Sequence, residues 1–467
     1  MYVDNPQSHC RFALVHGDIT PPSNIYHRMW GAAKHEQATG IHRPLRATIT
    51  LLAPLKGTER QFIIALDHCV MGRHEMDNLL YAVSEGSGIP NEELIVVFSH
   101  THAAGLMGLE RSHFPGGDLI KPYLDSISLK IIDLVKEAIE NIQTVTILYG
   151  TGKCDLAANR DFWDEDNQQW ACGYNPDKRA DETVLVAQAI SEEGSLLASI
   201  VNYACHPTTL AWDNTLISPD FPGAMRETIE AATNESPCLF LQGASGELGP
   251  VEGFVGDPLV ADKNGLQLAY ASLSTMTKLP APNKRFEYSG PVISGATLGE
   301  WKYNDLPEEQ RAKNKCWKIK RKSILLPIRH GTPSIKKVEA ELEDLEQSDA
   351  KDARAMIERK RRLLYRLNQL PSQENFPLEV IILRLGNAIW VIVQGELYSI
   401  FQQTLRKRFS GIPIIISTIA SHWGASYLPP KEIYGTGIYQ ETIALVAEGS
   451  LEQVIEDVSS TIEDLIK

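Results

Sequence analysis

The sequence lacks the features of several protein classes. Its 467 residues contain no Cys-x-x-Cys pair, and the seven cysteines are odd in number and scattered. Reduced thiols are therefore the simplest interpretation, and no structural zinc knuckle is indicated. No apolar run reaches the roughly eighteen residues of a membrane-spanning helix, and the N-terminus lacks the basic start and apolar core of a secretory signal. We expect a cytoplasmic protein without a transmembrane segment.

Positive charge is also scarce, because the formal net charge is −14. An acidic chain does not offer the concentrated basic surface that phosphate backbones require, so nucleic acid is not an expected partner. One basic cluster, Arg359-Lys360-Arg361-Arg362, lies in a helical stretch and is interpreted as a solvated helix face. With 43% hydrophobic and 22% charged residues, the composition is that of an ordinary globular protein.

Short apolar runs alternate with amphipathic stretches, which predicts an α/β fold with helices flanking a central sheet. The hairpin signals Gly386-Asn387 and Glu192-Glu193-Gly194-Ser195 favour a mixed sheet over a purely parallel one. The expected strands span residues 61–66, 94–98, 144–149, 196–204, 238–241, 378–385, 389–393 and 412–417.

A charged stretch at residues 334–370 carries apolar residues at helical spacing and predicts a helical hairpin inserted into the α/β body. We expect residues 1–467 to form one catalytic domain around this insertion. An amphipathic closing helix is predicted from Leu451 to Leu465.

The most informative motif is His100-Thr101-His102, which follows the apolar run 94–98. Two further strands end at residues of the ligand type, His206 and Glu396, and functional groups of α/β proteins gather at such ends. His100, His206 and Glu396 would form the two-nitrogen, one-oxygen set of a catalytic zinc site. Each has a plainer explanation: exposed loop histidines, a His-Pro strand end, and a glutamate at the start of a helix.

At this point the sequence resembles the neutral/alkaline (non-lysosomal) ceramidase family, specifically its N-terminal catalytic domain. The similarity covers residues 12–440 except the helical insertion. Tyr427 and Tyr439 resemble the family's two active-site tyrosines by their spacing. The other matching segments are Gly17-Asp18-Ile19-Thr20-Pro21-Pro22, Gly40-Ile41-His42, Asp67, His100-Thr101-His102, Asn159-Arg160, Asn202-Tyr203-Ala204-Cys205-His206, Gln242 to Pro250 and Gly395-Glu396.

The resemblance implies a zinc ion held by His100, His206, Glu396 and Tyr427. It also implies hydrolysis of an amide bond between a fatty acyl group and an amine. In that chemistry zinc acidifies water to a pKa of about 7 and polarises the carbonyl. Carried over residue by residue, Arg160 and Tyr439 would orient and polarise the scissile carbonyl. His102 would lie beside the metal as a proton carrier for the leaving amine.

Two departures from the family bear on the substrate. Gly249 stands where the family has a serine, and Ala103-Ala104-Gly105 replaces its glycine-proline tail. From the length of 467 residues we expect the family's C-terminal sandwich domain to be missing. We therefore expect a small-molecule or lipid-like N-acyl substrate, which need not be ceramide. The oligomeric state, including a homo-oligomer, stays open.

Several alternatives compete with this interpretation. A family member that has lost catalysis could bind a small ligand through the same fold. Ser245 lacks the second glycine of a nucleophile elbow, and Cys205 is better assigned to the core than to a thiol nucleophile. Asp220 could orient His206 or cap a helix. The aromatic residues Trp163, Trp170 and Tyr174 could line a cleft or simply pack.

Overall fold

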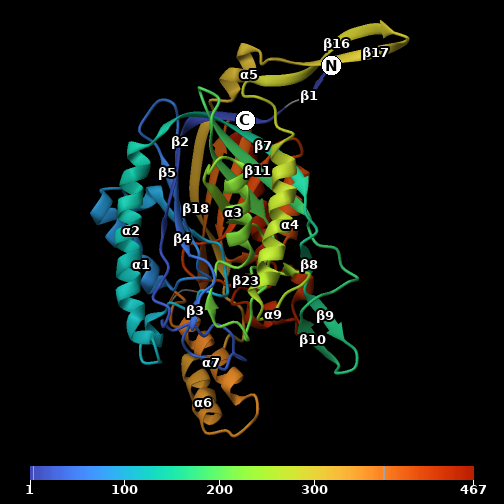
Figure 1. Cartoon of the computed structure of the whole chain (residues 1–467). Coiled ribbons are helices and arrows are strands. Elements are labelled where there is room, and N and C mark those ends of the chain that lie inside the picture. Colours follow the sequence, from blue (N-terminus) through green and yellow to red (C-terminus); the bar gives the residue numbers. More distant parts are fainter. Residues whose placement is uncertain (4, 372–373) are drawn as a thin grey trace.

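The computed structural model, which describes residues 1–3, 5–371 and 374–467, is built on one mixed sheet of twelve strands (Figure 1). Three neighbouring pairs are parallel, β12–β14, β5–β6 and β20–β22, and the others are antiparallel. The strands follow one another across the sheet in this order: β14 (Cys238–Gln242), β12 (Leu196–Tyr203), β11 (Thr183–Ser191), β7 (Gln143–Lys153), β2 (Gln7–Asp18), β4 (Arg46–Ala53), β5 (Gln61–Leu66), β6 (Leu94–Phe98), β22 (Ile414–Ala420), β20 (Ala388–Gln394), β19 (Asn375–Leu385) and β18 (Trp317–Pro327). The predicted α/β class with a mixed sheet is confirmed.

The sheet folds back on itself, so that strands far apart in its order lie side by side. The Asn202 amide on β12 donates to the Ile416 carbonyl on β22 at 2.7 Å and accepts from its N–H at 3.0 Å. The Trp390 indole on β20 reaches the Tyr149 hydroxyl on β7 at 3.3 Å. Apolar side chains from both halves meet in one inner core. This explains why β5, β6 and β22 are buried on both faces, β6 as a continuous apolar run and the other two as largely apolar strands.

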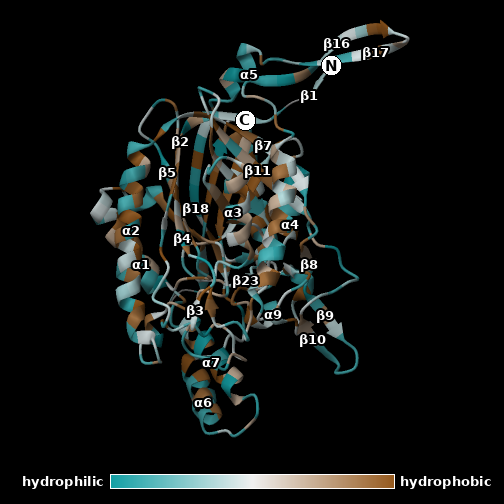
Figure 2. Ribbon diagram, viewed as in Figure 1, coloured by the Kyte–Doolittle hydropathy of each residue, from teal (hydrophilic) through white to brown (hydrophobic). Residues whose placement is uncertain are grey.

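Paired helices cover the outer faces of the sheet. Figure 2 shows hydrophobic residues gathered on the central strands and mixed hydrophobic and hydrophilic residues along the flanking helices, as amphipathic packing requires. The pairs are α1 (Arg73–Ser87) with α2 (Ile120–Glu140), α3 (Phe221–Ala232) with α4 (Pro258–Met276), and α8 (Ile400–Arg408) with the predicted closing helix α10 (Ser450–Ile466).

The N-terminal eight strands of the sheet meet the C-terminal four at the β6–β22 junction. This junction contains a single paired position, Ala420 with Val97, extended by a hydrogen bond of 2.8 Å from Ser421 N to Val96 O. The chain segments that follow β6 and β22 diverge at this junction and form part of the candidate site described below.

The helical stretch predicted at residues 334–370 contains α6 (Ile335–Glu346) and α7 (Ala353–Leu367), which project from the body at one end of the sheet (Figure 1). The hairpin is anchored to the body by apolar and ionic contacts. Val338 and Leu367 pack with Leu445, and Glu358 accepts a hydrogen bond of 2.8 Å from Arg111, both side chains being buried.

At the other end of the sheet, β16 (Lys284–Ser294) and β17 (Ala296–Asp305) form an arm with β1 (Tyr2–Val3) (Figure 1). The remaining elements are short: the strand pairs β3 (Gly40–Ile41) with β13 (Leu216–Ile217), β8 (Ala157–Asn159) with β15 (Leu248–Pro250), β9 (Asp161–Asp164) with β10 (Gln169–Cys172) and β21 (Glu396–Leu397) with β23 (Tyr427–Leu428), the helices α5 (Glu308–Lys313) and α9 (Tyr439–Ile443), and 3-10 turns at Asn91–Glu93, Leu109–Arg111, Gly117–Leu119 and Lys431–Ile433.

Among the described residues, no helix combines the length and apolarity needed to cross a membrane. All seven cysteines are free thiols, as expected from their scattered positions.

Candidate metal and active site

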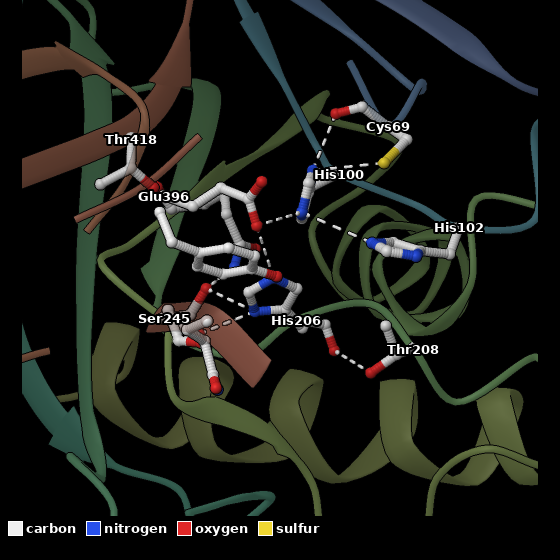
Figure 3. Close-up of polar contacts among 12 residues, drawn as sticks. Cys69, His100, His102, His206, Thr208, Ser245, Glu396 and Thr418 are labelled. Carbon is white, nitrogen blue, oxygen red and sulfur yellow. Dashed lines mark hydrogen bonds and ion pairs between the residues drawn. The ribbon is translucent and has the colours of Figure 1, made fainter. Parts of the chain in front are cut away.

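The four residues predicted to bind a metal lie together where strands of the sheet end. His100 follows β6 and adopts a left-handed backbone (φ 69°), which is rare for a residue with a side chain. His206 follows β12, and Glu396 and Tyr427 pair with each other as neighbours on the parallel strands β21 and β23. Figure 3 shows the rings of His100, His102 and His206 and the Glu396 carboxylate turned toward one another.

The distances among these groups suit one small cation. Glu396 Oε2 lies 3.4 Å from His100 Nε2 and 3.2 Å from His206 Nε2. In a tetrahedral zinc site with bonds of about 2.0–2.1 Å, neighbouring ligand atoms are separated by about 3.3 Å. The ligand atoms of His100, His206 and Glu396 all lie within 4.8 Å of one another, and the three side chains are buried.

The hydrogen bonds of the two imidazoles determine which nitrogen is free. His100 Nδ1 lies 2.8 Å from the Cys69 carbonyl, and His206 Nδ1 lies 2.7 Å from the Ser245 carbonyl. A carbonyl only accepts, so each Nδ1 carries a proton, and in the neutral form of each ring Nε2 presents a lone pair. Both lone pairs then face the same carboxylate oxygen. A cation between them resolves this repulsion, and the residues therefore fit a metal ion.

A second group of potential ligands, Cys69, His100 and His102, shares one histidine with the first. Cys69 Sγ lies 3.5 Å from His100 Nδ1, the nitrogen that already donates to a carbonyl. The group therefore does not offer three free donor atoms, and the set with Glu396 is the better one.

Burial and neighbouring charges shift the pKa values of the histidines in this cluster in both directions. Burial alone would raise the pKa of Glu396, but hydrogen bonds from His100 and His206 hold that pKa well below its usual value. Burial lowers the pKa of His206 to about 3, so its imidazole is neutral. Burial also lowers the pKa of His102, and the nearby histidines add to this effect. Burial alone would lower the pKa of His100, but Cys69 and Glu396 raise it to about 10. The cluster thus combines an ionised carboxylate, the neutral imidazoles of His102 and His206, and a favoured positive charge at His100 beside the carboxylate.

Tyr427 and Arg160 complete the inner part of the site. Tyr427 Oη lies 3.4 Å from His206 Nε2 and accepts a hydrogen bond of 2.9 Å from Arg160 Nη2. Arg160 is 3% exposed and also donates to the Gly246 carbonyl at 2.7 Å. A guanidinium hydrogen bond to the phenol oxygen favours a polarised phenol, which strengthens Tyr427 as an oxygen ligand.

His102 and Tyr439, the two other predicted catalytic residues, border the same space. His102 Nε2 lies 3.4 Å from His100 Nε2, and the Tyr439 ring lies 6.0 Å from the Tyr427 ring. All seven predicted site residues are therefore brought into one region.

A cavity of about 330 Å³ opens onto four of these residues, His102, Arg160, Tyr427 and Tyr439. Its walls include residues that the sequence interpretation missed, because aromatic residues in separate loops and cationic residues of α7 come together only through the packing of the chain. The lining residues outside the predicted site are Trp30, Gly31, Cys172, Trp212, Phe254, Ala355, Glu358, Arg359, Arg362, Arg366, Trp423 and Ile443.

At this cavity one interpretation of the sequence needs correction in part, and one pair of alternatives is resolved. The solvated face expected for residues 359–362 holds for Lys360 and Arg361, which pair with surface glutamates, and for Arg359, which is exposed although it borders the cavity. It is wrong for Arg362, which is half-buried against the cavity because α7 folds over the site. The aromatic residues at 163, 170 and 174 are not part of its lining: Trp163 and Trp170 pack against each other on β9 and β10, with ring centroids 5.3 Å apart.

The competing nucleophiles are not supported by the geometry. Ser245 places its hydroxyl 3.2 Å from His206 Nδ1, but that nitrogen donates to a carbonyl and cannot accept the serine proton. Cys205 lies in the core, as predicted, and burial raises the pKa of its thiol. Asp220 caps α3 by accepting from Phe221 N at 2.6 Å, so of its two predicted roles the structure supports the cap.

Gly249 lies on β15, beside the site. A Cβ atom added there would lie 3.6 Å from Thr208 Oγ1 and 3.7 Å from Arg160 Cδ, which are ordinary contacts. Steric crowding does not explain the absence of a side chain at this position.

Comparisons with known proteins agree with this geometry. The family model described as neutral/alkaline non-lysosomal ceramidase, N-terminal, matches residues 13–252, just over half of the chain. No curated protein matches. The neutral ceramidase from Pseudomonas aeruginosa shares the fold with a TM-score of 0.65 and 16% identity, over 98% of this chain and 74% of its own. A ceramidase complexed with C2 gives a TM-score of 0.66 at 16% identity, over 99% of this chain and 76% of its own.

Proposed function

Since this chain belongs to the neutral/alkaline non-lysosomal ceramidase family, we propose that it is a zinc-dependent hydrolase cleaving the amide bond between an acyl group and an amine. The observation that carries the proposal is that Nε2 of His100 and Nε2 of His206 both lie within 3.4 Å of one Glu396 oxygen, while each Nδ1 is held by a backbone carbonyl. We further propose that the chain acts as a single catalytic domain, with the α6–α7 hairpin as an insertion in it.

His100, His206, Glu396 and Tyr427 would hold the metal. When bound, zinc supplies Lewis acidity, which acidifies water and polarises an acyl carbonyl. The hydrogen bonds from Nδ1 of each histidine to a backbone carbonyl keep the rings oriented and raise their basicity.

The remaining residues of the site act on the substrate. Arg160 and Tyr439 border the cavity beside Tyr427 and would stabilise negative charge on the carbonyl oxygen as water adds to the carbon. His102 is neutral and 3.4 Å from His100, so it can accept a proton from the attacking water. Cleavage of the carbon–nitrogen bond requires that proton on the leaving amine, and His102 would deliver it.

A second candidate is a protein that binds a ligand but does not catalyse, and Gly249 in place of the family serine favours it. The retained cluster favours hydrolysis, because ligand binding alone needs neither an oriented metal set nor an adjacent neutral histidine. Hydrolysis of a substrate other than ceramide would account for both the retained cluster and the missing serine.

Metal analysis combined with activity assays tests the proposal. The purified protein is expected to contain about one zinc per chain, and to cleave N-acyl amides in a reaction that chelation abolishes and zinc restores. His206→Ala should lose both zinc and activity. The matched control is His74→Ala, on the exposed side of α1, which should retain both. Normal zinc content in His206→Ala would overturn the ligand assignment, and zinc without cleavage of any acyl compound would support the binding alternative.

A further inference from the structure

Helix α7 turns a row of arginines toward the cavity. Arg359, Arg362 and Arg366 are separated by three and four residues, a spacing that places side chains on one face of a helix. All three line the cavity together with Arg160. The only carboxylate among the lining residues is that of Glu358.

The Glu358 carboxylate does not neutralise this row. One of its oxygens accepts from Arg111 and the other from Arg362 Nε, each at 2.8 Å. Arg111 does not line the cavity, so one of the two ion pairs of Glu358 is made with a residue outside the cavity. The cavity therefore keeps an excess of positive charge.

Arg366 is the most unusual member of the row. It is 3% exposed, and among the residues that the structure describes it forms no ion pair, although the charge of Glu396 acts on it from a greater distance. Its guanidinium donates to the Ile443 carbonyl at 2.8 Å and lies 5.3 Å from the centroid of the Trp423 ring. Burial lowers its pKa to about 10, so the group remains charged at neutral pH. A buried cation without a counter-ion is costly, unless a ligand supplies the negative charge.

Arg362 provides a free hydrogen-bond donor at the same wall. Its Nη2 is buried and has no hydrogen-bond partner among the residues that the structure describes. Its Nε is fixed by Glu358, which holds the guanidinium in place. Guanidinium groups bind carboxylate and phosphate through paired N–H donors, and such contacts are stronger than those between neutral groups.

Another part of the cavity is aromatic. The Trp30 ring lies 5.2 Å from the His102 ring, 6.2 Å from Trp212 and 5.6 Å from Phe254. These rings offer apolar surface next to the proposed reaction centre, as an acyl chain requires. The volume of about 330 Å³ is at the low end for small-molecule sites and suits a single chain.

We propose that the amide cleaved at this site carries an anionic group, a carboxylate or a phosphate, which binds to Arg362 and Arg366. Its acyl chain lies against the aromatic rings of Trp30, Trp212 and Phe254. This inference rests on the proposed function, because it assigns the substrate class of the same hydrolytic site. It accounts for the Arg366 guanidinium without an ion-pair partner, for the free Nη2 of Arg362 and for the aromatic surface.

Three amides with the same acyl chain test it: N-octanoylglycine, N-octanoyl-O-phosphoethanolamine and the neutral N-octanoylethanolamine. The wild-type protein is expected to show a kcat/KM about tenfold or more higher for at least one anionic amide than for the neutral one. The anion that gives the higher value distinguishes carboxylate from phosphate. Equal values for all three would overturn the proposal.

Substitutions on α7 provide the matched comparison. Arg362→Gln and Arg366→Gln should each lower the anionic-to-neutral ratio by about tenfold, and Arg362→Lys should keep part of it. Arg361→Gln, whose guanidinium pairs with Glu346 at the surface, should keep the wild-type ratio. Thermal unfolding confirms that each variant is folded. An unchanged ratio in both Arg362→Gln and Arg366→Gln would refute the assignment.

Binding measured without catalysis separates this inference from the proposed function. Calorimetry with octyl phosphate, octanoate and octanol should show that an anion binds about tenfold or more tightly than the alcohol, and that Arg362→Gln removes this preference. If no amide is cleaved but this preference is found, the hydrolase proposal fails and the anion site stands. If amides are cleaved but the anions bind no better than octanol, only the anion site is refuted.

Discussion

Replacing Glu358 by glutamine should reveal how strongly the α6–α7 hairpin is held to the body of the protein. Burial alone would raise the pKa of Glu358, but the charges and hydrogen bonds of Arg362 and Arg111 hold it at about 2, compared with an ordinary value of 4.5. The ionised form of Glu358 is therefore more stable, relative to the protonated form, in the folded protein than in the unfolded chain. Because its folded pKa is depressed, its contribution to stability is fully present above pH 4.5 and is lost as the pH falls toward 2.

The difference in pKa corresponds to about 3 kcal/mol of stability at pH 7, and to about 2 kcal/mol at pH 3.5, where the unfolded carboxylate is already largely protonated. Removing one partner of a buried ion pair has a cost of the same order, about 3–5 kcal/mol. Glu358→Gln should thus destabilise the protein by about 3 kcal/mol at neutral pH, and by less in acid.

Urea unfolding of wild type and variant, at pH 7 and pH 3.5, measures both values. The control is Glu346→Gln, which removes the exposed partner of Arg361 on the same hairpin and should change stability by less than about 1 kcal/mol. A Glu358→Gln variant as stable as Glu346→Gln at pH 7 would refute the reasoning. So would a destabilisation that is independent of pH.

Two further predictions concern residues next to the site. Burial raises the pKa of Glu247 to about 7; the folded protein thus keeps a proton that the unfolded chain has lost, and stability should fall by roughly 2 kcal/mol between pH 5 and pH 8 from this group alone. Glu247→Gln should flatten that slope in urea unfolding, and an unchanged slope would contradict the shift. Gly249→Ser should unfold within about 1 kcal/mol of wild type, because the added Cβ meets only contacts of 3.6 and 3.7 Å. A larger loss in thermal or urea unfolding would show that the position excludes side chains.

The parts of the fold that sequence patterns predicted are those with strong local signals. The apolar runs at residues 61–66 and 94–98 coincide with β5 and β6, and Gly386-Asn387 joins β19 to β20 as the expected hairpin. The arm strands β16 and β17 were not predicted, because exposed polar residues interrupt their apolar pattern. The folding of the sheet onto itself depends on contacts such as Asn202 with Ile416, which lie 214 residues apart and have no local signature.

The candidate site also consists of residues that local sequence patterns could identify and residues that they could not. His100, His206 and Glu396 could be selected because each follows a predicted strand, and the family resemblance, which is confirmed, added Tyr427. No spacing rule could identify Arg366 as a wall of the cavity, because its place depends on how the α6–α7 hairpin packs. The apparent surface cluster at residues 359–362 was misjudged in part for the same reason.

The narrow β6–β22 junction has a consequence for the protein's local opening motions. His100 leaves the sheet on one side of this junction, while Glu396 and Tyr427 belong to the segment on the other side. A metal ion bound by residues from both sides stabilises only the state in which β6 and β22 are paired. It therefore suppresses local opening at this junction. Amide hydrogens around Val97 and Ala420 should therefore exchange with solvent more slowly in the zinc-loaded protein than in the chelated one. Hydrogen exchange at this junction would then report on metal occupancy even when no substrate is known.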